Sequence, residues 1–283
     1  MSDPHRRMAF LHEMGLGPVW SARHAAQAAA GVSDEMPYAE TAYGETISDP
    51  APAMAPAVAR APVLSMDDAF AASSPPVGET VVEEEQIDRA RMVARMDWSQ
   101  LQETVSECVQ CGLCRNRTQT VFGVGDQKAR WLFVGEGPGR NEDLQGQPFV
   151  GPAGKLLDNM MGAMGLQRGE NTYIANIVKC RPTDENRRDR PPSLEEASAC
   201  MPYLKRQIAL IDPTVIVAMG KTAALSLLQL DPATPVSRLR GTIHRYEEIP
   251  LIVTYHPAYL LRNLRDKRKT WADLCLAMQT FSA

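Results

Sequence analysis

Four short apolar runs alternate with stretches of helical periodicity, and this alternation constrains the fold more than any other feature of the chain. The runs cover residues 130–135, 172–178, 214–219 and 250–255, and the helical stretches cover residues 153–165, 194–210, 220–229 and 266–280. Strands that alternate with helices form a parallel sheet covered on both faces. We therefore expect a single α/β domain with three layers, α/β/α.

The first 82 residues differ in composition from the rest. Residues 21–82 are rich in Ala, Pro, Ser and acidic residues and have little periodicity, which predicts a disordered linker. Residues 1–83 carry 4 Lys and Arg against 11 Asp and Glu, whereas residues 84–283 carry 26 against 23. We therefore expect an acidic tail, residues 1–82, ahead of a mildly basic domain, residues 83–283, which would suit a polyanionic partner.

Two segments flank the predicted linker. Residues 5–20 predict a short amphipathic helix that Gly15 and Pro18 end. Such a peptide ahead of a linker can dock to a partner, but a weakly packed or functionless leader fits the same residues. After the linker, apolar residues from Ile87 to Leu101 recur at helical spacing, so order should begin near Glu83.

Polar loops follow three of the apolar runs. They are Gly135–Asp143 (GEGPGRNED), Asn176–Pro182 (NIVKCRP) and Tyr255–Arg262 (YHPAYLLR). A glycine-rich turn alone is weak evidence for a binding site, because a structural β-turn has the same composition. The carboxyl ends of parallel strands, however, meet at one edge of a sheet, where α/β proteins bind small ligands. The three loops therefore predict one site.

Six cysteines in a chain without a recognisable secretory leader indicate metal or thiol chemistry rather than a disulfide framework. Cys108-x-x-Cys111 with two distant cysteines is typical of a tetrahedral thiolate set, which binds zinc or an iron-sulfur cluster. Cys114 extends the pattern to a ferredoxin-like spacing. Cys275 lies among apolar residues and is expected to be a small buried residue.

Four ordered motifs then carry a specific resemblance. GEGPGRNED, PFVGPAG, NIVKCRP and HPAYLLR resemble the iron-sulfur-containing family 4 of the uracil-DNA glycosylase superfamily, over roughly residues 100 to 280. The resemblance implies a four-stranded parallel core and a hydrolase that cuts the N-glycosidic bond of uracil in DNA, which starts base-excision repair. It also implies a [4Fe-4S] cluster with ligands at Cys108, Cys111, Cys180 and Cys200, and no ligand at Cys114. We expect a structural role for this cluster.

The resemblance also assigns the residues that would read and release the base. A glycosylase takes its base out of the stack and reads its Watson–Crick edge. Phe149 matches the stacking phenylalanine, although a core aromatic is the alternative. Asn176 has the amide that can accept from uracil N3–H and donate to O4, although a turn residue is its alternative. His256 matches the histidine that donates to uracil O2 as negative charge develops there.

Further residues are expected to contact the DNA or support the site. Leu260 falls where related enzymes insert an apolar wedge, and Arg262 and Arg265 are expected to hold phosphates. A solvated face is the alternative for these arginines. Glu142 is expected among the substrate-binding residues, or as a brace of its loop.

One departure bears on the mechanism. Gly137 stands where the best-known family of the superfamily carries an aspartate that handles the attacking water. The catalytic set is therefore expected to comprise His256, Glu136 and Gly137, with Glu136 and its backbone holding water or base. We expect a dissociative, oxocarbenium-like step in which stabilisation of the leaving group contributes most.

The residues alone do not exclude two other functions. One is a uracil-DNA-binding protein with little turnover, but the group that it resembles adds a Lys-Arg-Arg-Ile-His segment, which this chain lacks. The other is an iron-sulfur nucleic-acid-binding module that recruits a repair or replication protein through residues 5–20. No apolar run has the length of a membrane span. We expect a cytoplasmic, nucleoid-associated monomer.

Overall fold

The computed structural model describes residues 87–282. The predicted helix at residues 5–20 and the predicted disordered tail, residues 1–82, lie outside the described residues. The expected start of order near Glu83 lies outside them as well.

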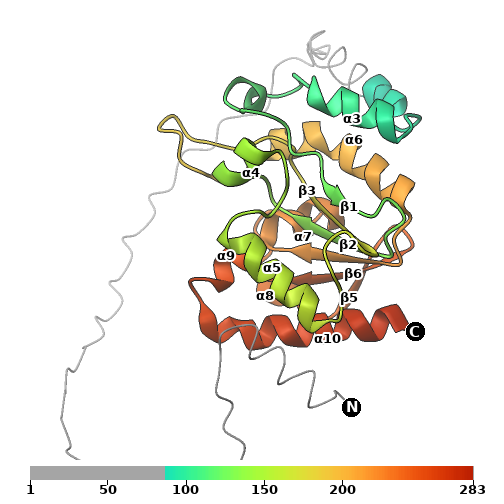
Figure 1. Ribbon diagram of the computed structural model, residues 1–283, viewed down its shortest axis with the longest axis vertical. Coiled ribbons are helices and arrows are strands. Elements are labelled where there is room, and N and C mark those ends of the chain that lie inside the picture. Colours follow the sequence, from blue (N-terminus) through green and yellow to red (C-terminus); the bar gives the residue numbers. More distant parts are fainter. Residues whose placement is uncertain (1–86, 283) are drawn as a thin grey trace, which may run out of the picture. The chain divides into compact units, whose positions relative to one another are not determined.

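A six-stranded sheet runs through the centre of the described residues (Figure 1). Its strands in chain order are β1 (Val124–Gly125), β2 (Trp131–Gly135), β3 (Thr172–Asn176), β4 (Val215–Met219), β5 (Ile243–Tyr246) and β6 (Ile249–Thr254). The order across the sheet is β1-β3-β2-β4-β6-β5. The central four strands are parallel and confirm the four predicted strands, whereas β1 and β5 pair antiparallel at the edges.

The two edge strands correct the expectation of a four-stranded sheet. β1 is only two residues long, too short to give a periodic signal. In β5 only the last of the four residues, Tyr246, is buried. Neither strand therefore contains an apolar run, because an edge strand needs little burial to complete its hydrogen-bond ladder.

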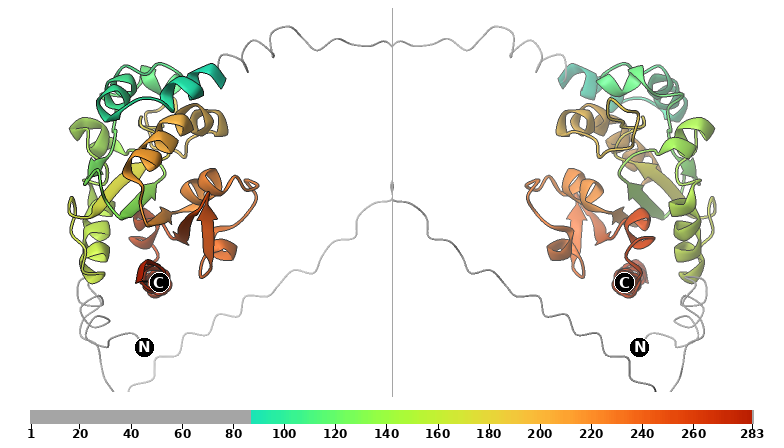
Figure 2. Two further views of the ribbon diagram at one scale, coloured as in Figure 1. Left: turned by 90° about the vertical axis from the view of Figure 1, so that its right-hand side faces the viewer. Right: turned by 90° about the vertical axis from the view of Figure 1, so that its left-hand side faces the viewer.

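Helices cover both faces of the sheet (Figures 1 and 2). They are α3 (Trp98–Ser106), η2 (Gly112–Arg115), α4 (Arg140–Gln145), α5 (Pro152–Ala163), α6 (Leu194–Ile211), α7 (Lys221–Leu228), α8 (Val236–Leu239), α9 (Pro257–Leu260), η3 (Leu264–Asp266) and α10 (Lys267–Ser282). The four predicted helices correspond to α5, α6, α7 and α10. None of the described helices is both long and apolar enough to cross a membrane.

Two hydrophobic cores, one on each face of the sheet, hold these layers together. Leu132 and Val134 of β2 pack into the core that includes buried residues of α3, α6 and α7. Trp131 and Phe133 of the same strand point the other way, into the core formed with α5, α9 and α10. This alternation follows from the two-residue period of a strand that is buried on both faces. The predicted α/β/α layering is confirmed.

The helical stretch expected from Ile87 to Leu101 consists of two helices. Residues 87–93 are helical, and α3 begins after a break. Asp97 ends the break because its side chain accepts a hydrogen bond from the Gln100 backbone N–H, while the Gln100 side chain accepts from the Asp97 backbone N–H. This reciprocal cap satisfies two backbone donors that the first turn of a helix otherwise leaves unpaired.

Candidate active site

The parallel strands bring the predicted loops to one edge of the sheet. Gly135 at the end of β2 pairs with Asn176 at the end of β3, and Met219 of β4 pairs with Thr254 of β6. The segments that follow these four residues therefore start side by side at the carboxyl edge. The predicted convergence of the three loops is confirmed, and the segment after β4 joins them.

Asn176 and Phe149 meet over Gly135. A Cβ atom at position 135 would lie 2.5 Å from Asn176 Oδ1 and 2.5 Å from Phe149 Cζ. Only glycine therefore leaves room for both side chains. Asn176 is 2% exposed, and its Oδ1 atom has no hydrogen-bond partner within the described residues. A buried amide oxygen without a partner is costly, so it points to a ligand that donates a hydrogen bond there.

Phe149 is held in an unfavourable backbone conformation. Its φ angle is 56°, in the left-handed region that residues with a side chain rarely adopt. Arg168 fixes this conformation by donating to Pro148 O at 3.1 Å and to Phe149 O at 2.9 Å. Gly154 allows it, because a Cβ there would lie 1.7 Å from Phe149 O. Backbone strain held in place by its surroundings is typical of functional residues.

His256 lies beside Phe149, and a local hydrogen bond determines which of its two ring nitrogen atoms carries the proton. The two ring centroids are 5.5 Å apart. The backbone N–H of Ala258 donates to His256 Nδ1 at 3.2 Å, so the proton of the neutral ring sits on Nε2. Burial lowers the pKa of His256 to about 4; the negative charge of Glu142 opposes this shift, and the positive charge of Arg262 adds to it. His256 is therefore a neutral hydrogen-bond donor near pH 7.

This lowered pKa predicts how stability depends on pH. The unfolded chain binds a proton on His256 near pH 6.5, before the folded protein does near pH 4. The stabilisation linked to His256 is therefore complete above pH 6.5 and is lost as the pH falls towards 4, by at most about 3 kcal/mol. Thermal melting from pH 8 to 4 should show a steeper acid loss for the wild type than for His256→Gln. An equal loss of stability in acid for the two proteins would contradict the lowered pKa of His256.

Glu142 accepts hydrogen bonds from the backbone of two loops beside the site. Its Oε1 atom accepts from the backbone N–H groups of Val150 and Gly151, each at 3.0 Å. Its Oε2 atom accepts from Gly139 N at 3.2 Å. Oε1 thus binds the backbone that follows Phe149, and Oε2 binds the loop after β2. These bonds fit the alternative role of Glu142, a brace of its loop, and its binding of substrate stays a prediction.

Glu136 and Gly137 follow β2 in different surroundings. The Thr222 hydroxyl donates to Glu136 Oε2, and burial raises the pKa of Glu136 above its ordinary value. A Cβ at position 137 would lie 2.7 Å from Val178 Cγ2, so this backbone has no room for a carboxylate there. The absence of the aspartate expected from the best-known family therefore has a packing reason.

The segment after β4 was missed by the sequence analysis. Gly220 has a φ angle of 93°, and a Cβ there would lie 3.0 Å from His256 Cβ. Thr222, at the start of α7, holds Glu136. The sequence signal that could have identified this segment is Gly-Lys-Thr at residues 220–222, directly after a buried strand.

Asp273 of α10 was also missed, and it anchors the end of β6. Its Oδ2 atom accepts from Thr254 Oγ1 at 2.7 Å and from Arg240 Nε at 2.7 Å. Asp273 is 1% exposed, so the carboxylate is fully enclosed with these partners. The contact fixes the residue two positions before His256. Asp273 and Thr254 are 19 residues apart in the sequence, so no local pattern predicts that they pair.

The structure places Leu260 in the core, with 0% of its surface exposed. A side chain that is buried in this way cannot insert between bases, so the expectation for Leu260 is wrong. Its neighbour Leu261 is 43% exposed and Leu264 is 53% exposed. Arg262 and Arg265 are exposed on the same segment.

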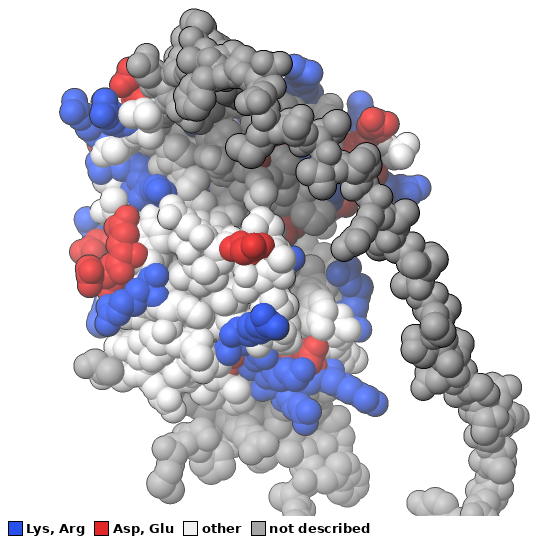
Figure 3. All heavy atoms as spheres, turned by 180° about the vertical axis from the view of Figure 1, so that it is seen from behind, with Lys and Arg blue, Asp and Glu red and all other residues white. Residues whose placement is uncertain are grey.

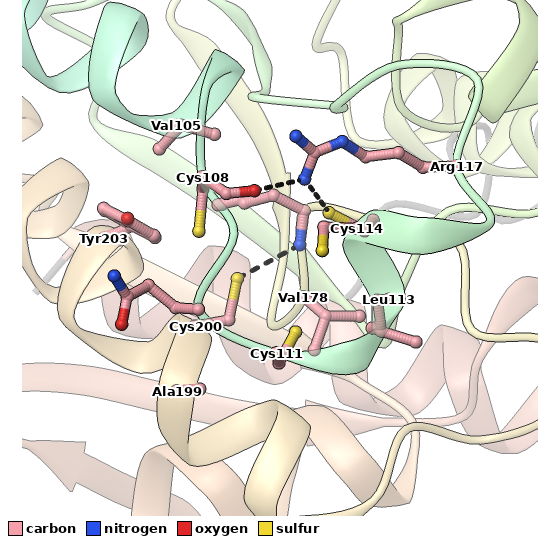
Figure 4. A pocket seen from close by; sticks show the side chains of 13 residues that line it. Val105, Cys108, Cys111, Leu113, Cys114, Arg117, Val178, Ala199, Cys200 and Tyr203 are labelled. Carbon is pink, nitrogen blue, oxygen red and sulfur yellow. Dashed lines mark hydrogen bonds between the residues drawn. The ribbon is translucent and has the colours of Figure 1, made fainter.

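Five cysteines line one cavity between the segment 108–115, the end of β3 and α6 (Figure 4). They are Cys108, Cys111, Cys114, Cys180 and Cys200. Cys180 and Cys200 are 5% and 8% exposed. The four cysteines expected to act together are therefore gathered in one place, although they come from three separate segments.

Hydrogen-bond donors face two of the sulfur atoms. Arg117 Nη1 donates to Cys180 Sγ at 3.2 Å and to Cys108 O at 2.6 Å. The backbone N–H of Lys179 donates to Cys200 Sγ at 3.3 Å. Burial raises the pKa of Cys200 to about 12, so this thiol needs a cationic group beside it to become a thiolate.

Among residues 87–282, no three His, Cys, Asp or Glu side chains are arranged to hold one metal ion. Cys114 lines the same cavity as the four expected ligands.

The sixth cysteine, Cys275, lies in α10. It is partly exposed, so its expected burial is wrong.

Basic side chains are not spread evenly over the face seen from behind Figure 1. On this face Lys and Arg gather in separate groups, with acidic side chains beside some of them (Figure 3). A polyanion that binds this face would meet separate basic groups.

Comparisons with known proteins give a family. Residues 122–275 match the family described as the Uracil DNA glycosylase superfamily. The chain is 45% identical over 163 residues to the Type-4 uracil-DNA glycosylase of Archaeoglobus fulgidus, covering 56% of this chain and 79% of the relative. The Type-4 enzyme of Thermotoga maritima is 45% identical, with 57% and 81% covered. That of Pyrobaculum aerophilum is 38% identical, with 64% and 93% covered.

Proposed function

Because this chain belongs to the uracil-DNA glycosylase superfamily, we propose that it is a monofunctional uracil-DNA glycosylase of the type-4 group. Its relatives at 38–45% identity carry that name. The observation that carries the proposal is the unpartnered Asn176 Oδ1 atom, buried beside Phe149 and near a neutral histidine. The N3–H group of a uracil ring that enters this site would supply the missing donor.

Asn176 reads the base. Its Oδ1 atom accepts from uracil N3–H, and its Nδ2 group donates to uracil O4. Cytosine presents the opposite pattern, an acceptor at N3 and a donor at N4, so it would leave both amide atoms unpaired. Phe149, fixed by Arg168, stacks on the face of the ring.

His256 stabilises the leaving group. The bond from the sugar C1′ atom to uracil N1 breaks, and its electron pair moves onto the base, where charge gathers on O2. The Nε2–H group of His256 donates to O2 and stabilises that charge at no cost of reorganisation. Water then adds hydroxide to C1′ and its proton goes to the base. Glu136, held by Thr222, and its backbone hold this water or the base.

The cysteine cavity is proposed to hold a [4Fe-4S] cluster through Cys108, Cys111, Cys180 and Cys200. The choice rests on the thiols that line one cavity and on the N–H donors to Cys180 and Cys200. The cluster would join three segments of the chain and add to folding stability. Cys180 lies four residues after Asn176, so this junction also fixes the loop that reads the base.

Contacts with the DNA are assigned to the segment after His256. We propose Leu261 as the apolar wedge in place of Leu260, because Leu261 is exposed next to Arg262. Arg262 and Arg265 then hold neighbouring phosphates. Residues 5–20 are proposed as a docking peptide for a repair or replication protein, and the enzyme as a nucleoid-associated monomer of the cytoplasm.

Asn176→Asp tests the proposed reading of the base. Aspartate cannot donate to uracil O4, so single-turnover release of uracil should fall by roughly 100-fold or more. Asn171→Asp is the matched control, because Asn171 precedes β3 at the opposite edge and its Oδ1 accepts from Arg130 N, which a carboxylate can also do. Wild-type rates in Asn176→Asp would remove Asn176 from recognition.

A further inference from the structure

The loop between β3 and α6 forms a small hairpin. Thr183 and Asp189 pair as an isolated antiparallel bridge, and Asp184 N donates to Arg188 O at 2.9 Å. Arg187 N donates to Asp184 O at 3.0 Å and closes the turn, with a φ angle of 59° at Arg187. The tip, residues 185–188, is exposed, but its backbone is held by these bonds.

Ion pairs occupy the arginines at the base of the hairpin but not those at its tip. Arg181 Nε lies 2.6 Å from Asp189 Oδ1, and Arg190 binds Glu196 through both Nη atoms, at 2.8 and 2.6 Å. Within the described residues, the side chains of Arg187 and Arg188 make no hydrogen bond or ion pair. The tip therefore presents two guanidinium groups that extend from a hydrogen-bonded backbone and have no acidic partner.

The base of the hairpin packs against the loop that follows β2. A Cβ at Gly137 would lie 3.4 Å from Pro182 Cδ, and a Cβ at Gly139 would lie 3.7 Å from Asp189 Oδ2. The hairpin therefore borders the loop that carries Glu136 and Gly137 of the candidate active site.

We propose that the tip of this hairpin is a DNA-backbone contact, in which Arg187 and Arg188 bind phosphates that flank the extruded nucleotide. The inference rests on the proposed function, which brings DNA to this edge. Arginine suits the role because its planar donor groups match the oxygen atoms of phosphate. Such contacts position the DNA and carry no sequence information. Glu185 on the same tip opposes them, since its carboxylate repels the backbone.

Double replacement of the two arginines tests the contact. The wild type, Arg187→Gln/Arg188→Gln, Glu185→Gln and a control, Arg95→Gln/Lys128→Gln, are titrated with duplex DNA that carries a stable abasic-site analogue, at several salt concentrations. The control removes the same charge from exposed residues, and Lys128 precedes β2 at the opposite edge of the sheet. Single-turnover uracil release at saturating DNA is measured in parallel.

We expect the double variant to bind roughly 5-fold to 30-fold more weakly at low salt, with the slope of log affinity against log salt reduced by about 1 to 2. The rate at saturating DNA should not change, Glu185→Gln should bind more tightly, and the control should match the wild type. Equal affinity and slope in the double variant, or equal weakening in the control, would overturn the inference. A wild type that binds but releases no uracil would refute only the proposed function.

Discussion

Replacing His256 by alanine is expected to slow single-turnover uracil release by roughly 100-fold to 1,000-fold, the effect of losing one preorganised donor to developing charge. The neutral Nε2–H group is the donor, because Nδ1 accepts from Ala258 N and burial keeps the pKa near 4. DNA affinity should change little, since phosphate contacts dominate it. The rate is measured with enzyme in excess over a labelled oligonucleotide.

His244→Ala is the matched control for this experiment. His244 lies on the edge strand β5, and its Nε2 atom contacts Leu239 O at 2.7 Å. Its loss should leave the rate within a few-fold of the wild type. A His256→Ala rate equal to that of the wild type would contradict the leaving-group mechanism, and Glu136 would become the candidate for a true general base.

Replacing Cys200 by serine is expected to remove most of the bound iron and to lower the melting temperature by about 10 °C or more. A loss of several kcal/mol produces such a shift, because 1 kcal/mol corresponds to roughly 2–4 °C in a domain of this size. Cys200 lies in α6 beside the loop after β3, since it receives a hydrogen bond from Lys179 N. As a proposed ligand it joins these two segments through the cluster, and serine would break that link. Iron analysis, the absorbance near 400 nm and thermal melting of anaerobically purified protein measure the effect.

Cys114→Ser is the control, because Cys114 lines the same cavity but is not among the proposed ligands. It should retain iron and stability. If Cys114→Ser lost the iron and Cys200→Ser kept it, the proposed ligand set would be wrong. A fully active wild type that contained zinc and no iron would contradict the cluster itself.

The central sheet could be predicted because its strands are buried on both faces. Runs such as Trp131–Gly135 and Val215–Met219 are apolar at every position, and helices with one apolar side lie between them. The edge strands could not be predicted, because Ile243 and Arg245 of β5 remain exposed and so leave no apolar run. The break before α3 depends on the Asp97 cap, whose sequence signal is weaker than that of the apolar periodicity around it.

The candidate site could be predicted only where its residues lie in local motifs. Asn176 and His256 follow buried strands, and the structure brings their segments to one edge. Leu260 and Leu261 are adjacent and chemically alike, so only the packing of α9 decides which one is buried. Asp273, in α10, accepts a hydrogen bond from Thr254 at the end of β6, and no spacing in the sequence predicts this contact.

The most direct test of the central claim is to incubate the wild-type protein with duplex DNA that carries one uracil and to identify the released base by mass spectrometry. Matched duplexes carry thymine or cytosine at the same position. The site predicts free uracil, an abasic site in an otherwise intact strand, and no release of thymine or cytosine. Recovery of the intact uracil-containing strand after incubation with folded, iron-loaded protein would contradict the assignment of this sheet edge as a uracil-excising site.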